Sequence, residues 1–120
     1  MSGDPELELQ RQRAAKNQSL FREVNERIED LAGSASVSTF ICECMNESCD
    51  ENVPLTIEEY EHIRSDGNCF LVLPRHEVPE VEETVEATER YLIVSKIGAG
   101  RDVAVHLDPR TRKGGNHDRN

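Results

Sequence analysis

Three of the four cysteines lie in one short stretch of the chain, and they restrict its fold more than any other feature. Cys42, Cys44 and Cys49 fall within eight consecutive residues. Zinc prefers about four ligands in a tetrahedron, and thiolates are its preferred structural ligands. Two cysteines separated by one residue can both reach an ion if the backbone turns tightly between them. The sequence therefore predicts a metal-binding knuckle, with zinc as the expected ion.

Two other interpretations of these thiols stay open. The three thiols could be unrelated, with one of them packed in the core. Cys42 and Cys44 could instead form a strained disulfide, and strained disulfides tend to be labile and regulatory. The negative charges of Glu43 and Glu47 are expected to raise the pKa of the neighbouring thiols. In the absence of a cation, thiols with a raised pKa are poor nucleophiles. This charge argument favours a metal over redox chemistry.

The fourth metal ligand is expected to be His76, which follows a predicted strand and a proline. An imidazole in such a turn could swing toward the knuckle. Cys69 is an alternative, because it begins the same strand and would complete an all-cysteine site. His62 and a water molecule are the remaining alternatives.

The small apolar content of the chain also favours a metal. Only 36% of the 120 residues are hydrophobic, 4% are aromatic and Trp is absent. Scaffolds with a small core often add a metal or a partner. We expect an N-terminal helix and linker over residues 1–36 and a small domain over residues 37–108. Residues 109–120 have the composition of a disordered basic tail.

Residues 6–32 are predicted to form one long helix, because neither Gly nor Pro interrupts them. Phe21, Val24, Ile28 and Leu31 recur at the spacing of one helical face and are expected to be buried. The first half of the helix offers little to bury, so we expect it to project or to contact a partner. Packing through the second half alone and a two-stranded coiled coil are the alternatives.

The rest of the chain predicts a small α+β domain. Thr56 and Glu59 have the spacing of a capping box, which marks a helix start. Pro79 suits the first turn of another helix, followed by acidic residues near its positive end. Strands are expected at residues 37–42, 69–73 and 91–97, with an edge strand or an amphipathic turn at residues 101–107. The predicted fold is a three- or four-stranded sheet covered by helices, and residues 69–97 permit parallel or antiparallel pairing.

Charge and hydropathy restrict location and partners. The formal net charge is −10, and residues 40–90 hold fourteen Asp and Glu against three Arg. Such an acidic segment repels phosphate, so nucleic acid is not an expected partner. No apolar run approaches the roughly 18 residues that span a bilayer. The first twenty residues are charged and lack an apolar stretch, so we expect no signal peptide. We expect a cytoplasmic protein, where thiols usually stay reduced.

The sequence favours an interaction protein over an enzyme. It contains neither a Gly-x-Ser-x-Gly elbow nor a Walker A motif. Three thiolates would leave a bound metal electron-rich and a weak Lewis acid. The expected function is that of a zinc-stabilised interaction or regulatory protein that binds a protein partner. A thiol redox sensor using Cys42 and Cys44 is the first alternative, and a small zinc enzyme is the second.

Five motifs form a distinctive combination along residues 16 to 110. They are residues 17–28 (NQSLFREVNERI), residues 40–44 (FICEC) with Cys49, Leu55-Thr56, residues 59–61 with Arg64, and His76-Glu77. In this combination the chain resembles a family of short, functionally uncharacterised bacterial proteins. The resemblance implies a cytoplasmic bacterial protein whose three cysteines and His76 belong to the shared pattern. Cys69 departs from that pattern.

Overall fold

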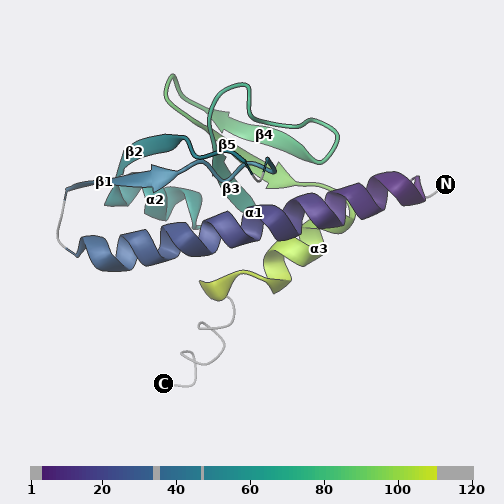
Figure 1. The fold of residues 1–120 in the computed structure, drawn as a ribbon, viewed down its shortest axis with the longest axis horizontal. Coiled ribbons are helices and arrows are strands. Elements are labelled where there is room, and N and C mark those ends of the chain that lie inside the picture. Colours follow the sequence, from purple (N-terminus) through teal and green to yellow (C-terminus); the bar gives the residue numbers. More distant parts are fainter. Residues whose placement is uncertain (1–3, 34–35, 47, 111–120) are drawn as a thin grey trace.

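The computed structural model describes residues 4–33, 36–46 and 48–110, whose arrangement is shown in Figure 1. The predicted α+β class is confirmed, with the long helix first. In chain order the elements are α1 (Pro5–Ala32), β1 (Val37–Ile41), β2 (Asn52–Thr56), α2 (Ile57–Ile63), β3 (Cys69–Val72), β4 (Glu82–Ala87), β5 (Leu92–Lys96) and α3 (Ala99–His106).

The start of α1 follows from local signals in the sequence. The Asp4 side chain caps the helix by accepting a hydrogen bond from the Glu6 amide at 2.9 Å. Pro5 occupies the first turn, where its missing N–H costs nothing. The helix is 28 residues long but mostly polar. Within the described part of the chain, no helix combines the length and apolar character needed to cross a membrane.

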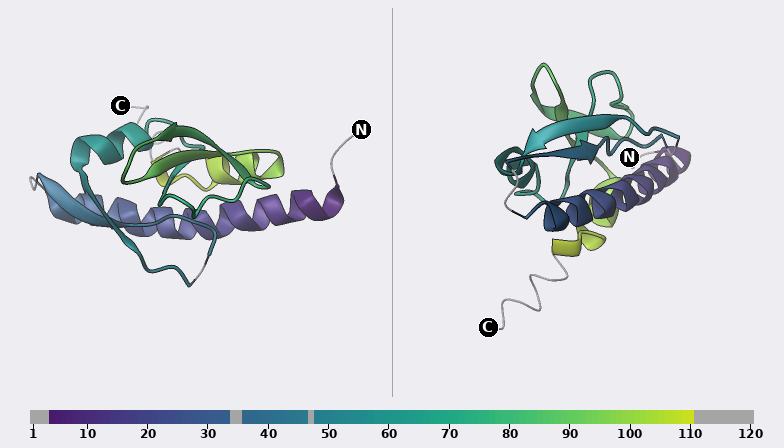
Figure 2. Two further views of the ribbon diagram at one scale, coloured as in Figure 1. Left: turned by 90° about the horizontal axis from the view of Figure 1, so that it is seen from above. Right: turned by 60° about the vertical axis from the view of Figure 1, so that its left-hand side comes forward.

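Two antiparallel sheets lie on one side of α1 (Figures 1 and 2). One sheet pairs β1 with β2, and the other has the strand order β3-β5-β4. Strand β2 was not predicted, and it contains Pro54, which opposes Thr39 of β1. A two-stranded sheet consists only of edge strands, where proline is tolerated. The β3–β5 pairing is antiparallel, which settles the alternative that the sequence left open.

The helix predicted from Pro79 is wrong. Pro79 lies in a turn closed by a 3.0 Å hydrogen bond from the Val81 amide to the Val78 carbonyl. Residues 82–87 then form β4, which pairs with β5 and carries a register shift between Thr84 and Glu86. Glu83, one of the acidic residues taken as helix N-terminal, is exposed on β4 together with Glu86, and such charges protect an edge strand from further pairing. Glu82, which was assigned the same role, is instead buried. Pairing with β5 is a non-local interaction, and it outweighed the local helix signal.

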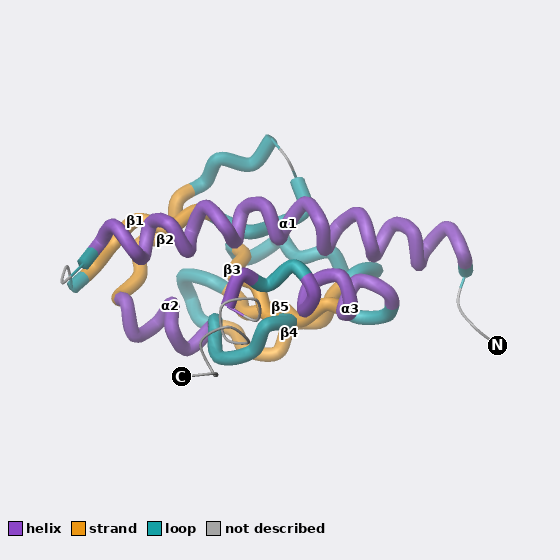
Figure 3. The backbone as a smooth tube through the Cα atoms, turned by 90° about the horizontal axis from the view of Figure 1, so that it is seen from below, coloured by secondary structure: helices purple, strands orange, loops and turns teal. Residues whose placement is uncertain are grey.

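The segment expected to form an edge strand or an amphipathic turn at residues 101–107 forms a helix up to His106. Neither of the two predictions is therefore correct. This helix is part of α3, which packs along the N-terminal half of α1 (Figure 3). The two helices approach closely at Gly100, where a Cβ atom would lie 2.7 Å from the Arg11 carbonyl oxygen. Ala15 and Ala104 are also fully buried there. The first half of α1 is therefore packed on its own domain and does not project.

The predicted buried face of α1 is also wrong. Val24 and Leu31 are exposed, and Phe21 and Ile28 are only half-buried. Three polar residues at helical spacing, Gln18, Arg22 and Asn25, are instead fully buried; we call them the inner ridge. Arg22 donates hydrogen bonds to the carbonyls of Gly67 at 2.7 Å and Ala104 at 2.8 Å. The helix is held to the domain by hydrogen bonds more than by an apolar stripe.

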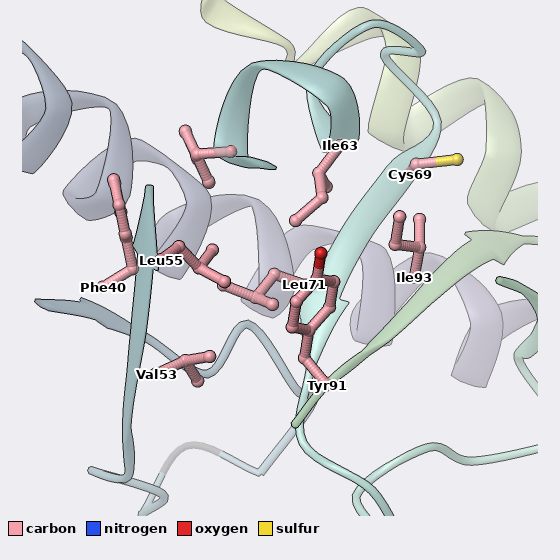
Figure 4. Close-up of a cluster of buried hydrophobic side chains, with 9 residues drawn as sticks. Phe40, Val53, Leu55, Ile63, Cys69, Leu71, Tyr91 and Ile93 are labelled. Carbon is pink, nitrogen blue, oxygen red and sulfur yellow. The ribbon is translucent and has the colours of Figure 1, made fainter. Parts of the chain in front are cut away.

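The main apolar core lies between the two sheets and α2 (Figure 4). Its buried members are Phe40, Val53, Leu55, Tyr60, Ile63, Cys69, Leu71, Tyr91 and Ile93. The rings of Phe40 and Tyr60 stack with centroids 4.4 Å apart. Just before Tyr60, the predicted capping box is confirmed: Thr56 Oγ1 accepts from the Glu59 amide at 3.0 Å, and Glu59 accepts from the Thr56 amide at 2.9 Å.

The described chain continues beyond α3 into the region expected to begin a tail. Arg110 makes ion pairs with Glu26 and Glu29 of α1 at 2.8 Å each, and with Glu61 of α2 at 2.7 Å. Arg64, the C-cap residue of α2, also pairs with Glu26. The ion pairs of Arg110 therefore hold the segment that follows α3 against α1 and α2. Residues 111–120, which make up the rest of the predicted tail, lie outside the described residues.

A buried ion pair between β4 and β5 yields a test of this packing. Lys96 Nζ lies 2.7 Å from Glu82 Oε1 and also contacts Gln18. Because both charges are buried, Lys96→Met should destabilise the fold by about 3–5 kcal/mol by leaving Glu82 unpaired. The double variant Lys96→Met/Glu82→Met should recover most of that loss. Urea unfolding followed by circular dichroism measures both, with exposed Lys16→Met as the control; a double variant no more stable than the single one would contradict this account.

Candidate metal centre

Three chain segments meet at the cysteine cluster. Cys42 and Cys44 follow β1, Cys49 precedes β2, and His76 follows β3. The ligand atoms of these four side chains all lie within 4.8 Å of one another, an arrangement that could hold a metal ion. Cys42 and Cys44 are buried, whereas Cys49 and His76 are half-buried. The structure thus brings together the four residues singled out in the sequence.

The distances within the cluster match the dimensions of a zinc site. His76 Nδ1 lies 3.5 Å from Cys42 Sγ and 3.6 Å from Cys49 Sγ. A zinc tetrahedron with Zn–S of ~2.3 Å and Zn–N of ~2.0–2.1 Å has S···N edges of about 3.6 Å. These two distances within the group therefore have the lengths that such an ion would need. Nδ1 is the imidazole nitrogen that faces the sulfurs.

Backbone hydrogen bonds hold Cys42 and its neighbours between the two sheets. The Cys42 amide donates to the Glu51 carbonyl at 3.1 Å, which continues the β1–β2 pairing. The next amide, that of Glu43, donates to the Leu71 carbonyl of β3 at 2.6 Å. The Leu73 amide donates to Cys42 Sγ at 3.3 Å. An amide directed at a sulfur stabilises its thiolate form, which is the form that binds metals.

Glu43, between Cys42 and Cys44, points into the protein and not toward the thiols. Its Oε2 accepts hydrogen bonds from Asn25 at 2.7 Å and from the Tyr60 hydroxyl at 3.1 Å. Its Oε1 accepts from the Leu71 amide at 2.9 Å. The expected effect of Glu43 on the thiols therefore does not apply, because its charge is directed to other partners. Glu47, the other acidic residue in that prediction, lies outside the described residues.

The inner ridge of α1 supports the cysteine segment from behind, a role not foreseen from sequence. Asn25 donates to the Ile41 carbonyl and accepts from the Ile41 amide, both at 2.8 Å. Gln18 donates to the Glu43 carbonyl at 2.8 Å. These side chains position the backbone on both sides of Cys42. Their helical spacing was visible in the sequence, but polar residues at that spacing usually mark a solvent face.

The thiols of the cluster share their protons unequally. A hydrogen bond from Cys42 lowers the pKa of Cys44 to about 5, although burial opposes this shift. The same hydrogen bond, followed by burial, raises the pKa of Cys42. Burial raises the pKa of Cys49. A divalent cation would favour deprotonation of all three.

The alternative fourth ligands are engaged elsewhere. Cys69 belongs to the main core, and burial raises its pKa to about 11. His62 is exposed on α2 and lies 2.9 Å from Glu86 of β4. Neither belongs to the group of four that could hold a metal.

The cluster is open to solvent on one side. A cavity of about 330 Å³ is lined by Cys44, Met45, Asn46, Arg75, His76, Glu77 and Val78. Arg75 adopts a left-handed backbone conformation (φ 75°), which is unfavourable for a non-glycine residue. This turn comes directly before His76, whose amide donates to the Leu73 carbonyl at 2.9 Å. The turn at residues 73–76 thus places the His76 imidazole beside Cys42.

Comparisons with known proteins identify no relative. The chain matches no protein-family model, no curated protein and no solved structure. What the cluster can do therefore follows from its geometry and from the chemistry of its side chains.

The buried hydrogen bonds of the Glu43 carboxylate yield a stability prediction. In Glu43→Gln, the amide nitrogen would face a hydrogen-bond donor, because all three partners of the carboxylate donate. We expect a loss of about 2–3 kcal/mol in the free energy of unfolding, since hydrogen bonds to a buried charged group are strong. Urea unfolding of the metal-saturated protein measures it, with exposed Glu89→Gln as the matched control. Equal stability of the two variants would refute the anchoring role.

Proposed function

We propose that this protein is a small interaction protein whose fold is stabilised by one zinc ion, held by Cys42, Cys44, Cys49 and His76. The observation that carries the proposal is the pair of S···N distances, which agree with the edges of a zinc tetrahedron. Four protein ligands would leave no open coordination position, as is usual in structural sites.

The position of the site supports a structural role. Its ligands come from the β1–β2 connection and from the segment after β3, so an ion there would join the two sheets. Zinc binding to small domains supplies about 10–16 kcal/mol of apparent free energy. Most domains have a total stability of only about 5–15 kcal/mol. Loss of the ion would therefore remove most of the folding free energy of so small a core.

The proposed interaction role is supported by the surface of the described residues. Large apolar side chains are exposed on α1 at Leu9, Leu20, Val24 and Leu31. Leu20 and Val24 lie one helical turn apart and line a shallow depression of about 320 Å³, and exposed apolar patches are characteristic of sites that bind other proteins. A cytoplasmic location and membership of the short bacterial family described above remain parts of this proposal. Reduced thiols, which the site requires, are usual in the cytoplasm.

Thiol redox sensing is the second candidate, and one observation favours it. Cys44 borders the open cavity, and the hydrogen bond from Cys42 lowers the pKa of Cys44 to about 5, which favours its thiolate form. Thiolate character and access both promote oxidation. A bound zinc ion would compete with this chemistry, because it occupies the same sulfur.

Metal analysis tests the structural zinc. Protein purified under reducing conditions should contain one zinc per chain after dialysis, and a strong chelator should unfold it, as seen by circular dichroism. His76→Ala should bind zinc much more weakly, because one ligand in four is lost. His106→Ala, which removes an exposed histidine of α3, should leave zinc content unchanged. Equal zinc loss in both variants would contradict the assignment of His76.

Peroxide treatment separates the two candidates. If zinc is structural, zinc-loaded protein should resist dilute peroxide, and its thiols should become reactive only after chelation. A metal-free, folded protein in which Cys42 and Cys44 cycle reversibly between thiol and disulfide would instead establish the redox sensor. Mass spectrometry after alkylation measures the thiol state in each case.

A further inference from the structure

The face of α1 that points away from the domain carries apolar and basic residues at a regular spacing. Leu9, Leu20 and Leu31 lie eleven residues apart, as do Arg13 and Val24, and Lys16 and Arg27. Eleven residues correspond to about three helical turns, so such residues form a nearly straight row along the helix. We call these seven residues the outer row. All seven are exposed.

The outer row lies opposite the inner ridge. Both sheets lie on one side of α1 (Figure 1). The inner ridge contacts this side, because Asn25 bonds to Ile41 of β1, Gln18 bonds to the Glu43 carbonyl and Arg22 lies over the Phe70 ring of β3. The exposed fractions of Leu9, Leu20, Val24 and Leu31 are 46, 61, 47 and 79%. A shallow depression of about 320 Å³ is lined by Leu20, Glu23, Val24 and Arg27. The row therefore offers apolar contacts and a recess that no described part of the chain covers.

The cations of the outer row have no ion-pair partner among the described residues. Arg13, Lys16 and Arg27 stay unpaired, although the chain carries a net charge of −10. By contrast, Arg11, Arg64, Lys96 and Arg110 each pair with an acidic residue. On this face the three cations Arg13, Lys16 and Arg27 lie beside the exposed leucines and outnumber Glu23, the acidic residue that lines the depression. An acidic binding surface would complement this charge.

A second copy of this chain fits the outer row poorly. An antiparallel pair centred on Leu20 would place Arg13 opposite Arg27 of the other copy. A parallel pair would place each cation against itself. Like charges at such close positions are unfavourable. An anionic membrane is also disfavoured, because the strongly acidic segment at residues 40–90 would be repelled by the same lipids.

We propose that the outer row of α1 is the docking surface for an acidic amphipathic helix of another protein. The apolar residues of that helix would contact Leu20, Val24 and Leu31, and its Asp and Glu residues would pair with Arg13, Lys16 and Arg27. Helices dock in this way through apolar residues three and four positions apart. This inference rests on the proposed interaction function and names its surface and the chemistry of its partner.

Photo-crosslinking in cells of the source organism tests the docking surface. Full-length protein carries benzoylphenylalanine at position 24, on the outer row, or at position 102, on the exposed surface of α3. We expect position 24 to crosslink to a partner peptide that has apolar residues at helical spacing and flanking Asp or Glu. Position 102 should not crosslink to that peptide. Mass spectrometry identifies the crosslinked segment.

Charge reversal supplies the matched comparison. Arg13→Glu/Arg27→Glu should reduce the position-24 crosslink by about tenfold or more, since like charges would then face each other. Arg101→Glu, an exposed reversal on α3, should leave it unchanged. Because all these side chains are exposed, zinc content and circular dichroism should match the parent protein. A synthetic peptide of the crosslinked segment should bind the parent in solution and lose a similar factor of affinity with the double variant.

Several outcomes would overturn the proposal. These are a crosslink to a second copy of this chain, sedimentation with phosphatidylglycerol vesicles in place of a protein crosslink, and a partner peptide without acidic residues. A crosslink from position 102 but not from 24 would leave partner binding intact and refute this surface. Complete absence of crosslinks from zinc-loaded protein would refute both partner binding and the surface. Loss of zinc from the parent protein would instead count against the metal site.

Discussion

The structure depends on the fact that the Glu43 side chain points in the opposite direction to the side chains of Cys42 and Cys44. Cys42 and Cys44 turn their thiols toward His76, while the carboxylate between them bonds to Asn25, Tyr60 and Leu71. In an extended segment, successive side chains point to opposite faces. One short stretch of backbone therefore connects the candidate metal ligands on one side with the core on the other. Displacement of Glu43 would move two ligands together, so the core and the candidate metal centre are coupled.

The polar interior of α1 follows from the same arrangement. The backbone near Cys42 leaves β1 and crosses toward β3, so it cannot satisfy all its hydrogen bonds within one sheet. Gln18 and Asn25 supply the missing partners. Buried backbone groups without partners are costly, which explains why a helix with few apolar residues packs inward through its polar face. Its leucines are left outside, and this gives α1 two faces of different character.

Elements with local signals were predictable from sequence. The Thr56–Glu59 capping box, the apolar runs of β3 and β5 and the uninterrupted length of α1 all identify their elements. Elements that depend on distant partners were missed: β4 forms because β5 lies beside it, and β2 forms despite Pro54 because β1 pairs with it. The group Cys42, Cys44, Cys49 and His76 could be proposed from residue type and spacing. The support from Asn25 and Gln18 could not, because it needs the position of α1 relative to β1.

The central claim is that these four side chains hold one zinc ion in a closed tetrahedral site. X-ray absorption spectroscopy at the zinc edge of the purified protein tests it most directly. The account predicts a shell of three sulfurs at ~2.3 Å and one nitrogen at ~2.0–2.1 Å. A shell made only of oxygen and nitrogen, or a folded protein that contains no zinc, would contradict it.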